Sequence, residues 1–577
     1  MRSSRRAASA LADLMAADES EVLTLALPGG GTLFEAGETC GMVYVLRAGR
    51  LAAIHPGHPP KFLGLIWPGE AIGEISVLAD IPHTASVVAM RDSELLAMPR
   101  AAFLDAVQKH PAILIELMRT MIARAQSERA VKKLAVAFAF LAAGEGPPVC
   151  ALVEGLRRAV EENGARTALL TAEHLAHPTE WFSAREEEHD FVFYVAEAGE
   201  TAWAAHCLRQ ADRSFWIGRG DTEPPPAAPL PLARTTLKPA DLLLVHPRDC
   251  TRPSGGGAWQ KALCCRQIFH LRESDPADIA RLARVITGRS VGVVLSGGGA
   301  RGYAHVGALR ALHEHGVPVD FVGGASMGAV IAAGLACGWD GEEMVARVKT
   351  AFVETNPLSD LAVPLIALTR GRVVDRRLAD NFGDTDIRDL WRPFYCVSSD
   401  LTNGAHLVHD SGLLRRALRA SIALPGILPP VVEGDNVLVD GGVMRNLPID
   451  LMQDLHDGPI VAVDVSIDTG LTPKDIETPR SLAHWALSGA WRKGAPIVSL
   501  LLRSATVTAT RDVIAARGAA DVFIAPELDG VEIRDWRAFE PAVEAGYRAA
   551  ARALESLDCP LTELRVRRGR CDEDHGR

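Results

Sequence analysis

Apolar and polar residues follow three different patterns along the chain. Between residues 23 and 99, short apolar alternations are interrupted by Gly and Pro, as in residues 42–46. This is typical of short β-strands joined by turns. Residues 100–133 then space apolar side chains as one face of a helix does. That face consists of Leu104, Val107, Ile113, Leu117 and Met121. We predict a β-rich domain with a helical tail over residues 1–133.

From residue 134 the pattern changes to alternating strands and helices. Residues 134–143 form an apolar run, residues 150–162 have helical spacing and end before Gly164, and residues 167–171 are again strand-like. Such alternation favours a parallel sheet covered by helices on both faces. We predict a middle α/β domain over residues 134–285. A third α/β unit, with a mainly helical extension after Pro473, is expected over residues 286–577.

Composition narrows the classes of partner. The chain has 577 residues, enough for about three domains of ordinary size. Its net charge is -11 and it has no long block of Lys and Arg, which argues against nucleic acid as the partner. No apolar run reaches the roughly 18 residues of a membrane span. The ten cysteines have no C-x-x-C spacing, so we expect free thiols, no metal and no cofactor. A cytoplasmic protein is expected, with peripheral contact at the inner face of the membrane left open.

A glycine-rich loop marks the first candidate site. Residues 290–296 are an apolar run suited to a buried central strand, and they lead directly into Gly-Gly-Gly-Ala-Arg-Gly at 297–302. A helical pattern follows over residues 303–315. Glycine amides at a strand-to-helix turn can approach and hold an anion. Two anions suit such a loop: a phosphate, or the oxyanion of a tetrahedral intermediate.

The next strand and turn favour the oxyanion. Residues 319–323 predict a strand, and Gly324-Ala-Ser-Met-Gly328 follows before a helix of small residues. A G-x-S-x-G sequence between strand and helix is typical of a nucleophile elbow that exposes Ser326. The pattern alone is weak, because two glycine turns also occur in ordinary doubly wound sheets. Its position one strand after the glycine loop makes the catalytic interpretation the stronger one.

Ser326 needs a base. Asp440 ends the apolar strand 437–440 and enters a Gly-Gly turn, so it is one candidate. A strand-end Asp that accepts hydrogen bonds from turn amides is equally consistent with this pattern. His456 and His484 are the candidates for an ordinary Ser-Asp-His triad, although neither lies in a sequence motif that indicates a catalytic role. The buried or solvated positions expected for His305 and His313 argue against a catalytic role for them.

Together these segments resemble a known family. The glycine loop, the serine elbow and Asp440-Gly-Gly, in that order, resemble the signature of patatin-like phospholipases. The resemblance implies a three-layer α/β/α hydrolase domain and a Ser326–Asp440 dyad without a catalytic histidine. It implies that Ser326 attacks acyl esters of lipids. It also implies an oxyanion hole in the loop formed by Gly297, Gly298, Gly299, Ala300, Arg301 and Gly302. The apolar segment 422–432 is expected to line an acyl-chain groove, touch a membrane or pack in the core.

The N-terminal region resembles the cyclic nucleotide-binding β-roll in residues 31–38, 43–51 and 69–86. In that family a Glu holds the ribose hydroxyl and an Arg pairs with the cyclic phosphate. Glu74, Thr84 and Ala85 match the family pattern, but His83 stands in the place of the Arg. A largely neutral imidazole lacks the permanent charge and planar fork of Arg. We therefore expect cyclic nucleotide binding to be weak, pH-dependent or lost.

The middle domain has the order of a nucleotide-binding βα turn over residues 134–162 but no G-x-x-x-x-G-K-[ST]. We expect a degenerate nucleotide-binding-like scaffold. A cyclic nucleotide-like domain ahead of a patatin-like domain resembles the neuropathy target esterase group of lysophospholipases. The whole pattern predicts a serine acyl hydrolase of lysophospholipids or phospholipids, regulated through its N-terminal domain. The alternatives are a ligand-sensing regulatory protein with a weak or silent hydrolase domain, and a Ser-Asp-His carboxylesterase.

Overall fold

The computed structural model describes most of the chain. The described residues are Leu11, Met15, 22–57, 61–115, 117–118, 137–144, 146–225, 240–363, 365–466 and 517–565. Met121, His484 and most of the predicted helical extension after Pro473 lie outside them. The chain divides into two compact units, one with residues 1–219, 224–243 and 262–267, the other with the remainder.

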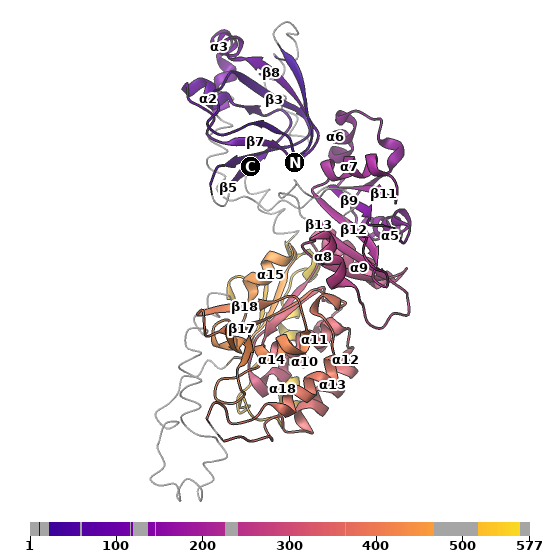
Figure 1. Cartoon of the computed structure of the whole chain (residues 1–577), viewed down its shortest axis with the longest axis vertical. Helices are drawn as coiled ribbons and strands as arrows, with labels where there is room; N and C mark the ends of the chain where they lie inside the picture. Colours follow the sequence, from indigo (N-terminus) through magenta and orange to yellow (C-terminus); the bar gives the residue numbers. More distant parts are fainter. Residues whose placement is uncertain are drawn as a thin grey trace, which may run out of the picture. The chain divides into compact units, whose positions relative to one another are not determined.

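The N-terminal domain is a roll of two antiparallel four-stranded sheets (Figure 1). The first sheet orders β1 (Leu23–Leu27), β8 (Ser93–Pro99), β3 (Met42–Ala48) and β6 (Ala71–Ile72). The second orders β2 (Thr32–Phe34), β7 (Ser86–Ala89), β4 (Leu51–His55) and β5 (Lys61–Ile66). Alternation along β3 explains how one strand serves two cores: Val43 and Val45 pack with α3 (Arg100–Lys109), while Leu46 packs in the other cluster.

The middle domain contains a six-stranded sheet. Its strand order is β10 (Thr167–Leu170), β11 (Phe191–Ala196), β9 (Ala137–Ala142), β12 (Arg213–Arg219), β13 (Ala240–His246) and β14 (Ile268–Arg272). The pairings of β10 with β11, β11 with β9 and β12 with β9 are parallel. Strand β9 is buried along nearly its whole length, as expected of a central parallel strand. The helix predicted at 150–162 is α5 (Val149–Glu162).

The C-terminal domain is built on an eight-stranded mixed sheet. The strand order is β19 (Val431–Glu433), β20 (Asn436–Asp440), β17 (Phe394–Asp400), β16 (Phe321–Ala325), β15 (Gly292–Leu295), β21 (Ile460–Val463) and β22 (Val522–Ile524), with β18 (Ala405–His409) paired to β17. The four pairings from β17 through to β22 are parallel, whereas β20 is antiparallel to β17. After β15 the chain forms β16, which pairs with one edge of β15. The later strand β21 pairs with the other edge. The carboxyl end of β15 is therefore a topological switch point, where α/β sheets commonly bind ligands.

Helices cover both faces of this sheet. Val293 and Leu295 of β15 face a core shared with α10 (Tyr303–Glu314) and α11 (Ser326–Cys337). The alternate residue Gly292 faces the opposite layer, where Met452 of α15 (Ile449–Leu455) leaves no room for a side chain. The central strand thus separates two helical layers.

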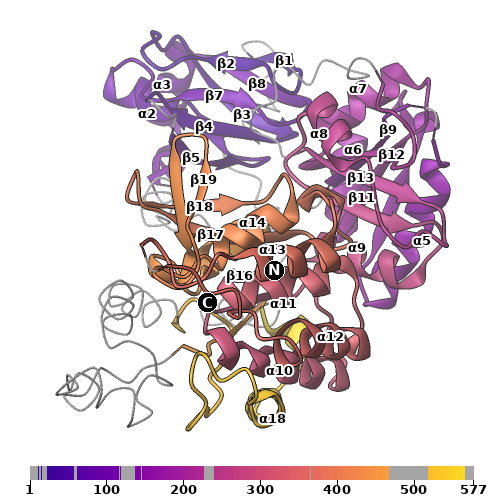
Figure 2. The same ribbon diagram turned by 60° about the horizontal axis from the view of Figure 1, so that its bottom comes forward.

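The segment after residue 517 belongs to the same domain. Strand β22, which the helical pattern did not predict, extends the sheet beside β21. Helix α18 (Phe539–Glu555) packs closely on α10 (Figure 2). A Cβ at Gly546 would lie 1.9 Å from the carbonyl oxygen of Ala304, so this crossing requires glycine.

Candidate active site

The turn between β16 and α11 holds Ser326 in a strained conformation. Its φ is 52°, in the left-handed region that non-glycine residues rarely occupy. The flanking glycines are required by close packing on the end of β15. A Cβ on Gly324 or on Gly328 would lie 2.3 Å from the carbonyl oxygen of Leu295. The G-x-S-x-G spacing therefore reflects a tight strand-to-helix turn that presents a half-buried Ser326 side chain.

Asp440 lies opposite this serine. Ser326 Oγ donates a hydrogen bond of 2.6 Å to Asp440 Oδ2, although 114 residues separate them in the sequence. The other carboxylate oxygen, Oδ1, accepts a hydrogen bond of 2.8 Å from the amide of Gly442. Each carboxylate oxygen of Asp440 therefore has its own donor: Ser326 Oγ for Oδ2 and the Gly442 amide for Oδ1.

The environment of Asp440 suits a proton acceptor. Its side chain is 3% exposed. Burial raises the pKa of the Asp440 carboxyl to about 6, and the hydrogen bonds from Ser326 and Gly442 oppose that rise. A carboxyl with a pKa near 6 is mostly ionised at neutral pH and is a stronger base than an exposed aspartate.

The glycine loop approaches Ser326 directly after β15. A Cβ on Gly297 would lie 2.9 Å from Ser326 Cβ and 2.7 Å from Asn446 Oδ1, so only glycine fits there. The amide of Gly297 donates to Asn446 Oδ1 at 3.0 Å, and Asn446 Nδ2 donates to the carbonyl oxygen of Gly297 at 3.3 Å. Asn446 thus joins the glycine loop to the turn that follows Asp440.

The loop amides are not equivalent. Besides Gly297, whose amide is bound to Asn446, Ala300 donates to the carbonyl of Ile533 at 2.8 Å and Arg301 donates to the carbonyl of Gly298 at 3.2 Å. The amides of Gly298 and Gly299 have no acceptor among the described residues, and both glycines are half-buried. Among residues 297–301 of the loop expected to form an oxyanion hole, these are the two amides without a described acceptor.

Arg301 and Gly302 have other contacts. The Arg301 guanidinium donates to backbone carbonyls of Val465, Leu528 and Val531 at 2.8–3.1 Å. Gly302 is buried against Met327, which a Cβ would overlap. Both residues therefore fix the loop on neighbouring segments.

Two described histidines near the sheet, His456 and His305, are hydrogen-bonded to groups other than Ser326. His456 is stacked on Phe321, and a Cβ on Gly292, at the amino end of β15, would lie 2.3 Å from its Nε2. It therefore lies at the opposite end of the strand from the glycine loop. His305 Nε2 is hydrogen-bonded to the carbonyl of Ser296 at 2.8 Å. Burial lowers the pKa of each of these two histidines to about 4, so both are neutral.

A second serine supports the elbow. The amide of Ser326 donates to Ser421 Oγ at 2.9 Å, at the end of α14 (Leu414–Ser421). The amide of Asp440 donates to the carbonyl of Ala423 at 2.9 Å. The segment after α14 therefore contacts both members of the pair. No local pattern indicates this contact, because Ser421 and Ser326 are 95 residues apart in the sequence.

In the N-terminal roll, the predicted nucleotide residues are neighbours. Glu74 is the first residue of α2 (Glu74–Ala79) and is buried. His83 is also buried: its ring stacks on Phe34 at 3.5 Å and would lie 3.3 Å from a Cβ on Gly73. Burial lowers the pKa of His83. Thr84 is exposed and Ala85 half-buried. A phosphate at this position would face a neutral ring that is already stacked.

The N-terminus of α5 in the middle domain is occupied by an internal carboxylate. Glu197 accepts hydrogen bonds from the amides of Val149 and Cys150 at 3.1 and 2.7 Å. These are the groups that a phosphate-binding loop would offer to a nucleotide. The described residues contain no cluster of three or more His, Cys, Asp or Glu side chains suited to a metal ion.

Comparisons with known proteins agree with this architecture. The sequence matches the patatin-like phospholipase family over residues 293–452 and the cyclic nucleotide-binding domain over 24–110. It also matches the P-loop-like domain of the Neuropathy Target Esterase family over 146–281. These matches confirm the predicted class, an antiparallel roll, a parallel α/β domain and a patatin-like hydrolase domain.

Relatives extend the match over nearly the whole chain. An uncharacterized NTE family protein of Mycobacterium tuberculosis is 31% identical over 556 residues, covering 92% of this chain and 91% of the relative. Neuropathy target esterase sws of Drosophila melanogaster is 27% identical and lysophospholipase nte1 of Neosartorya fischeri 26%. Each alignment covers 92% of this chain but 42% of the longer relative. The chain belongs to the NTE family.

Proposed function

We propose that this chain is a serine acyl hydrolase that cleaves the acyl esters of lysophospholipids or phospholipids. The observation that carries the proposal is the 2.6 Å hydrogen bond from Ser326 Oγ to a buried carboxylate. A serine hydroxyl held against a base of raised pKa, on a strained turn, is arranged for nucleophilic attack. The patatin-like domain supplies the substrate class, an ester of a lipid.

In the proposed first step, Asp440 Oδ2 accepts the proton of Ser326 Oγ while Oγ forms a bond to the ester carbonyl carbon. The carbonyl oxygen becomes an oxyanion, which the amides of Gly298 and Gly299 stabilise. Collapse of the intermediate breaks the bond to the leaving alcohol, which takes the proton from Asp440. Ser326 then carries the acyl group.

In the second step, water adds to the acyl carbon and gives its proton to Asp440. The free fatty acid leaves, and Ser326 recovers its proton. Each proton that Asp440 accepts is returned within the same half-reaction, so the dyad needs no histidine. Removal of oxyanion donors from such sites typically lowers kcat about 10²–10³-fold, which sets the scale expected of the two glycine amides.

Regulation through the N-terminal roll is part of the proposal. The stacked, neutral His83 ring argues against tight binding of a cyclic nucleotide by the usual charge pairing. Peripheral contact of the hydrolase domain with a lipid surface is also proposed, because its substrates reside there. No helix in the described part of the chain is long and apolar enough to cross a bilayer.

The direct test is hydrolysis of lysophosphatidylcholine by the wild type and by Ser326→Ala, with release of fatty acid as the readout. We expect Ser326→Ala to lose at least about 10³-fold in kcat. Ser411→Ala, an exposed serine of the same domain, is the matched control and should retain full activity. Undiminished hydrolysis by Ser326→Ala would overturn the assignment.

A further inference from the structure

A short loop of the hydrolase domain exposes apolar side chains to an unusual degree. Leu361, Val363, Leu365 and Ile366 are 70%, 76%, 87% and 74% exposed, the highest values among the large apolar side chains of the described residues. Soluble proteins rarely concentrate such side chains in one place unless they bind something apolar. We refer to these residues as the 361–366 loop.

The base of the loop is ordered. Leu361 and Thr369 form an antiparallel bridge, and the amide of Ala362 donates to the carbonyl of Leu368 at 2.9 Å. The Asp360 carboxylate accepts from the amide of Arg372 at 2.7 Å, which fixes the loop on the start of α13 (Arg372–Phe382). Thr369 is buried. Hydrogen bonds therefore attach the residues that flank the exposed side chains to the rest of the domain.

The loop lies beside the segment that contacts the dyad. Leu368 and Thr369 donate their amides to the carbonyls of Gly426 and Ile427 at 2.9 and 3.1 Å. The same segment begins at Ser421, whose hydroxyl accepts from the amide of Ser326. The apolar tip and the nucleophile are thus attached to the two ends of one stretch of seven residues, 421–427.

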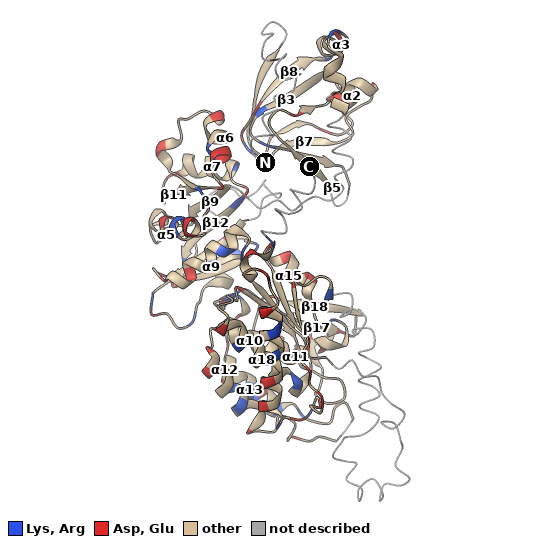
Figure 3. Cartoon of the chain, turned by 180° about the vertical axis from the view of Figure 1, so that it is seen from behind, with Lys and Arg blue, Asp and Glu red and all other residues tan. Residues whose placement is uncertain are grey.

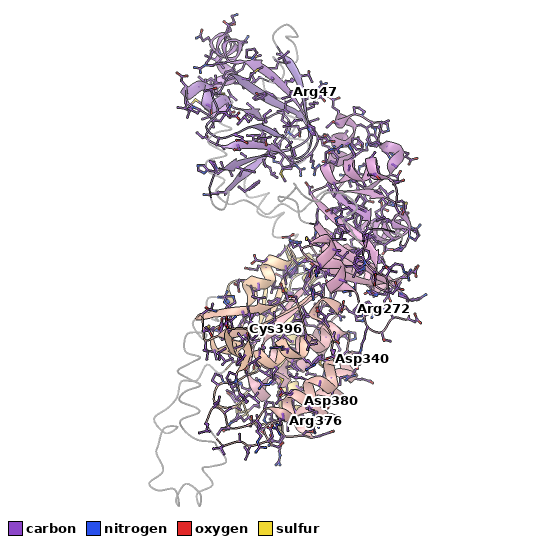
Figure 4. The ribbon with its side chains drawn as sticks, in the orientation of Figure 1. Arg47, Arg272, Asp340, Arg376, Asp380 and Cys396 are labelled. Atoms are coloured by element: carbon purple, nitrogen blue, oxygen red, sulfur yellow. The ribbon has the colours of Figure 1, made fainter. Side chains whose placement is uncertain are left out.

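Positive charge follows the apolar tip. Arg370, Arg372 and Arg376 are exposed. Figure 4 labels Arg376 on this part of the chain, and Figure 3 marks both basic and acidic positions near α13. The acidic residues of α13 are paired, Asp375 with Arg419 and Asp380 with Arg377. An apolar tip with arginines at its base matches the order of acyl chains and anionic headgroups in a lipid surface.

We propose that the 361–366 loop inserts into a lipid surface, where Arg370, Arg372 and Arg376 contact anionic headgroups, and so places Ser326 next to its substrate. This inference rests on the proposed lipid hydrolase function and adds the surface by which the protein reaches the lipid. A second copy of the chain could also cover the apolar side chains. Two copies would bring the same arginines together, and because like charges repel, an anionic surface is favoured.

The test uses the full chain with vesicles of phosphatidylcholine containing phosphatidylglycerol. The variant Leu365→Glu/Ile366→Glu changes exposed side chains only, and Leu63→Glu on exposed β5 of the roll is the control. Cosedimentation in the Ser326→Ala background measures binding without catalysis. We expect the double variant to bind at least tenfold more weakly than Ser326→Ala alone, and the control to bind equally well.

Activity separates this inference from the proposed function. The double variant should hydrolyse a water-soluble nitrophenyl butyrate at the wild-type rate, while its hydrolysis of vesicle lipid falls at least tenfold. If the wild type hydrolyses neither substrate, the proposed function fails. The vesicle-binding result still shows whether the 361–366 loop contacts lipid. Unchanged vesicle binding by the double variant would overturn the inference, and so would a dimer that dissociates in this variant without loss of binding.

Discussion

Gly297 and Asn446 exchange two hydrogen bonds across 149 residues of sequence, at 3.0 and 3.3 Å. This pair joins the glycine loop to the turn that follows Asp440, the base of the proposed mechanism. Because the amides of Gly298 and Gly299 follow directly, their direction relative to Ser326 depends on this contact. In the proposed mechanism Asn446 touches no reacting atom, and we infer that it acts as a positioning residue.

Replacing Asn446 should therefore affect the chemical step more than substrate binding. We expect Asn446→Ala to lower kcat roughly 10- to 100-fold with little change in KM, because misplaced oxyanion donors act on the transition state. Asn403→Ala, at an exposed turn of the same domain, should leave both constants unchanged. Steady-state kinetics on a nitrophenyl ester measure the difference, and a normal kcat for Asn446→Ala would refute the positioning role.

The raised pKa of Asp440 predicts a pH profile. The carboxylate form is the base, so kcat/KM should be half-maximal near pH 6, the pKa of Asp440, and level off roughly one pH unit higher. A profile governed by an ordinary aspartate would be half-maximal near pH 4 and level above roughly pH 5. Measuring kcat/KM from pH 4.5 to 8 on an uncharged ester separates the two.

The same raised pKa predicts that the folding stability of the wild type falls over the pH range in which its activity rises. The folded-state pKa of Asp440 lies above its unfolded value, so its ionisation disfavours the folded state as pH rises from about 4 to about 6. Asp440→Asn removes that charge. We expect the Tm of this inactive variant, relative to wild type, to increase between pH 4.5 and pH 8. A relative Tm that falls over this range would contradict the burial argument.

Ser326 should be a site where glycine stabilises the protein. At a φ of 52° a side chain costs roughly 1–2 kcal/mol, which glycine avoids. We expect Ser326→Gly to be more stable than Ser326→Ala by about 1 kcal/mol in urea unfolding. Ala379→Gly, on an exposed position of α13, should show the reverse and lose about 1 kcal/mol. Equal stability of the two Ser326 variants would show that the turn is not strained.

Much of the architecture could be predicted from the sequence because its signals are local. Two contiguous patterns each have one physical interpretation. They are the strand, glycine loop and helix at 290–315, and the elbow around Ser326. Asp440 was one of several candidates on residues alone, and the order of motifs in the family singled it out. Its spatial relation to Ser326 depends on the antiparallel pairing of β20 with β17, which no local pattern encodes.

The remaining features depend on long-range contacts. Which loop amides are already hydrogen-bonded depends on Asn446, which accepts from Gly297, and on Ile533, which accepts from Ala300 across 233 residues of sequence. Glu197 reaches the α5 N-terminus from the end of another strand. Strand β22 has only three residues, too few to show a period. The 361–366 loop has the composition of a core segment, and only the fold reveals its exposure.

The N-terminal roll offers a test by gain of function. If His83 is the reason for weak phosphate binding, His83→Arg should strengthen cyclic AMP binding at least tenfold in calorimetric titration, because Arg restores a charged, forked donor. His110→Arg, which adds the same charge at an exposed position, should have no effect. Tight binding by the wild type, unchanged in His83→Arg, would contradict this explanation.

The identity of the nucleophile can be tested most directly by covalent labelling. A fluorophosphonate reacts with an activated serine and leaves a mass that peptide mapping can locate. The account predicts a single labelled site at Ser326 in the wild type, with labelling at least about 10²-fold slower in Asp440→Asn. Labelling at another serine, or undiminished labelling of Ser326 in Asp440→Asn, would contradict the Ser326–Asp440 dyad.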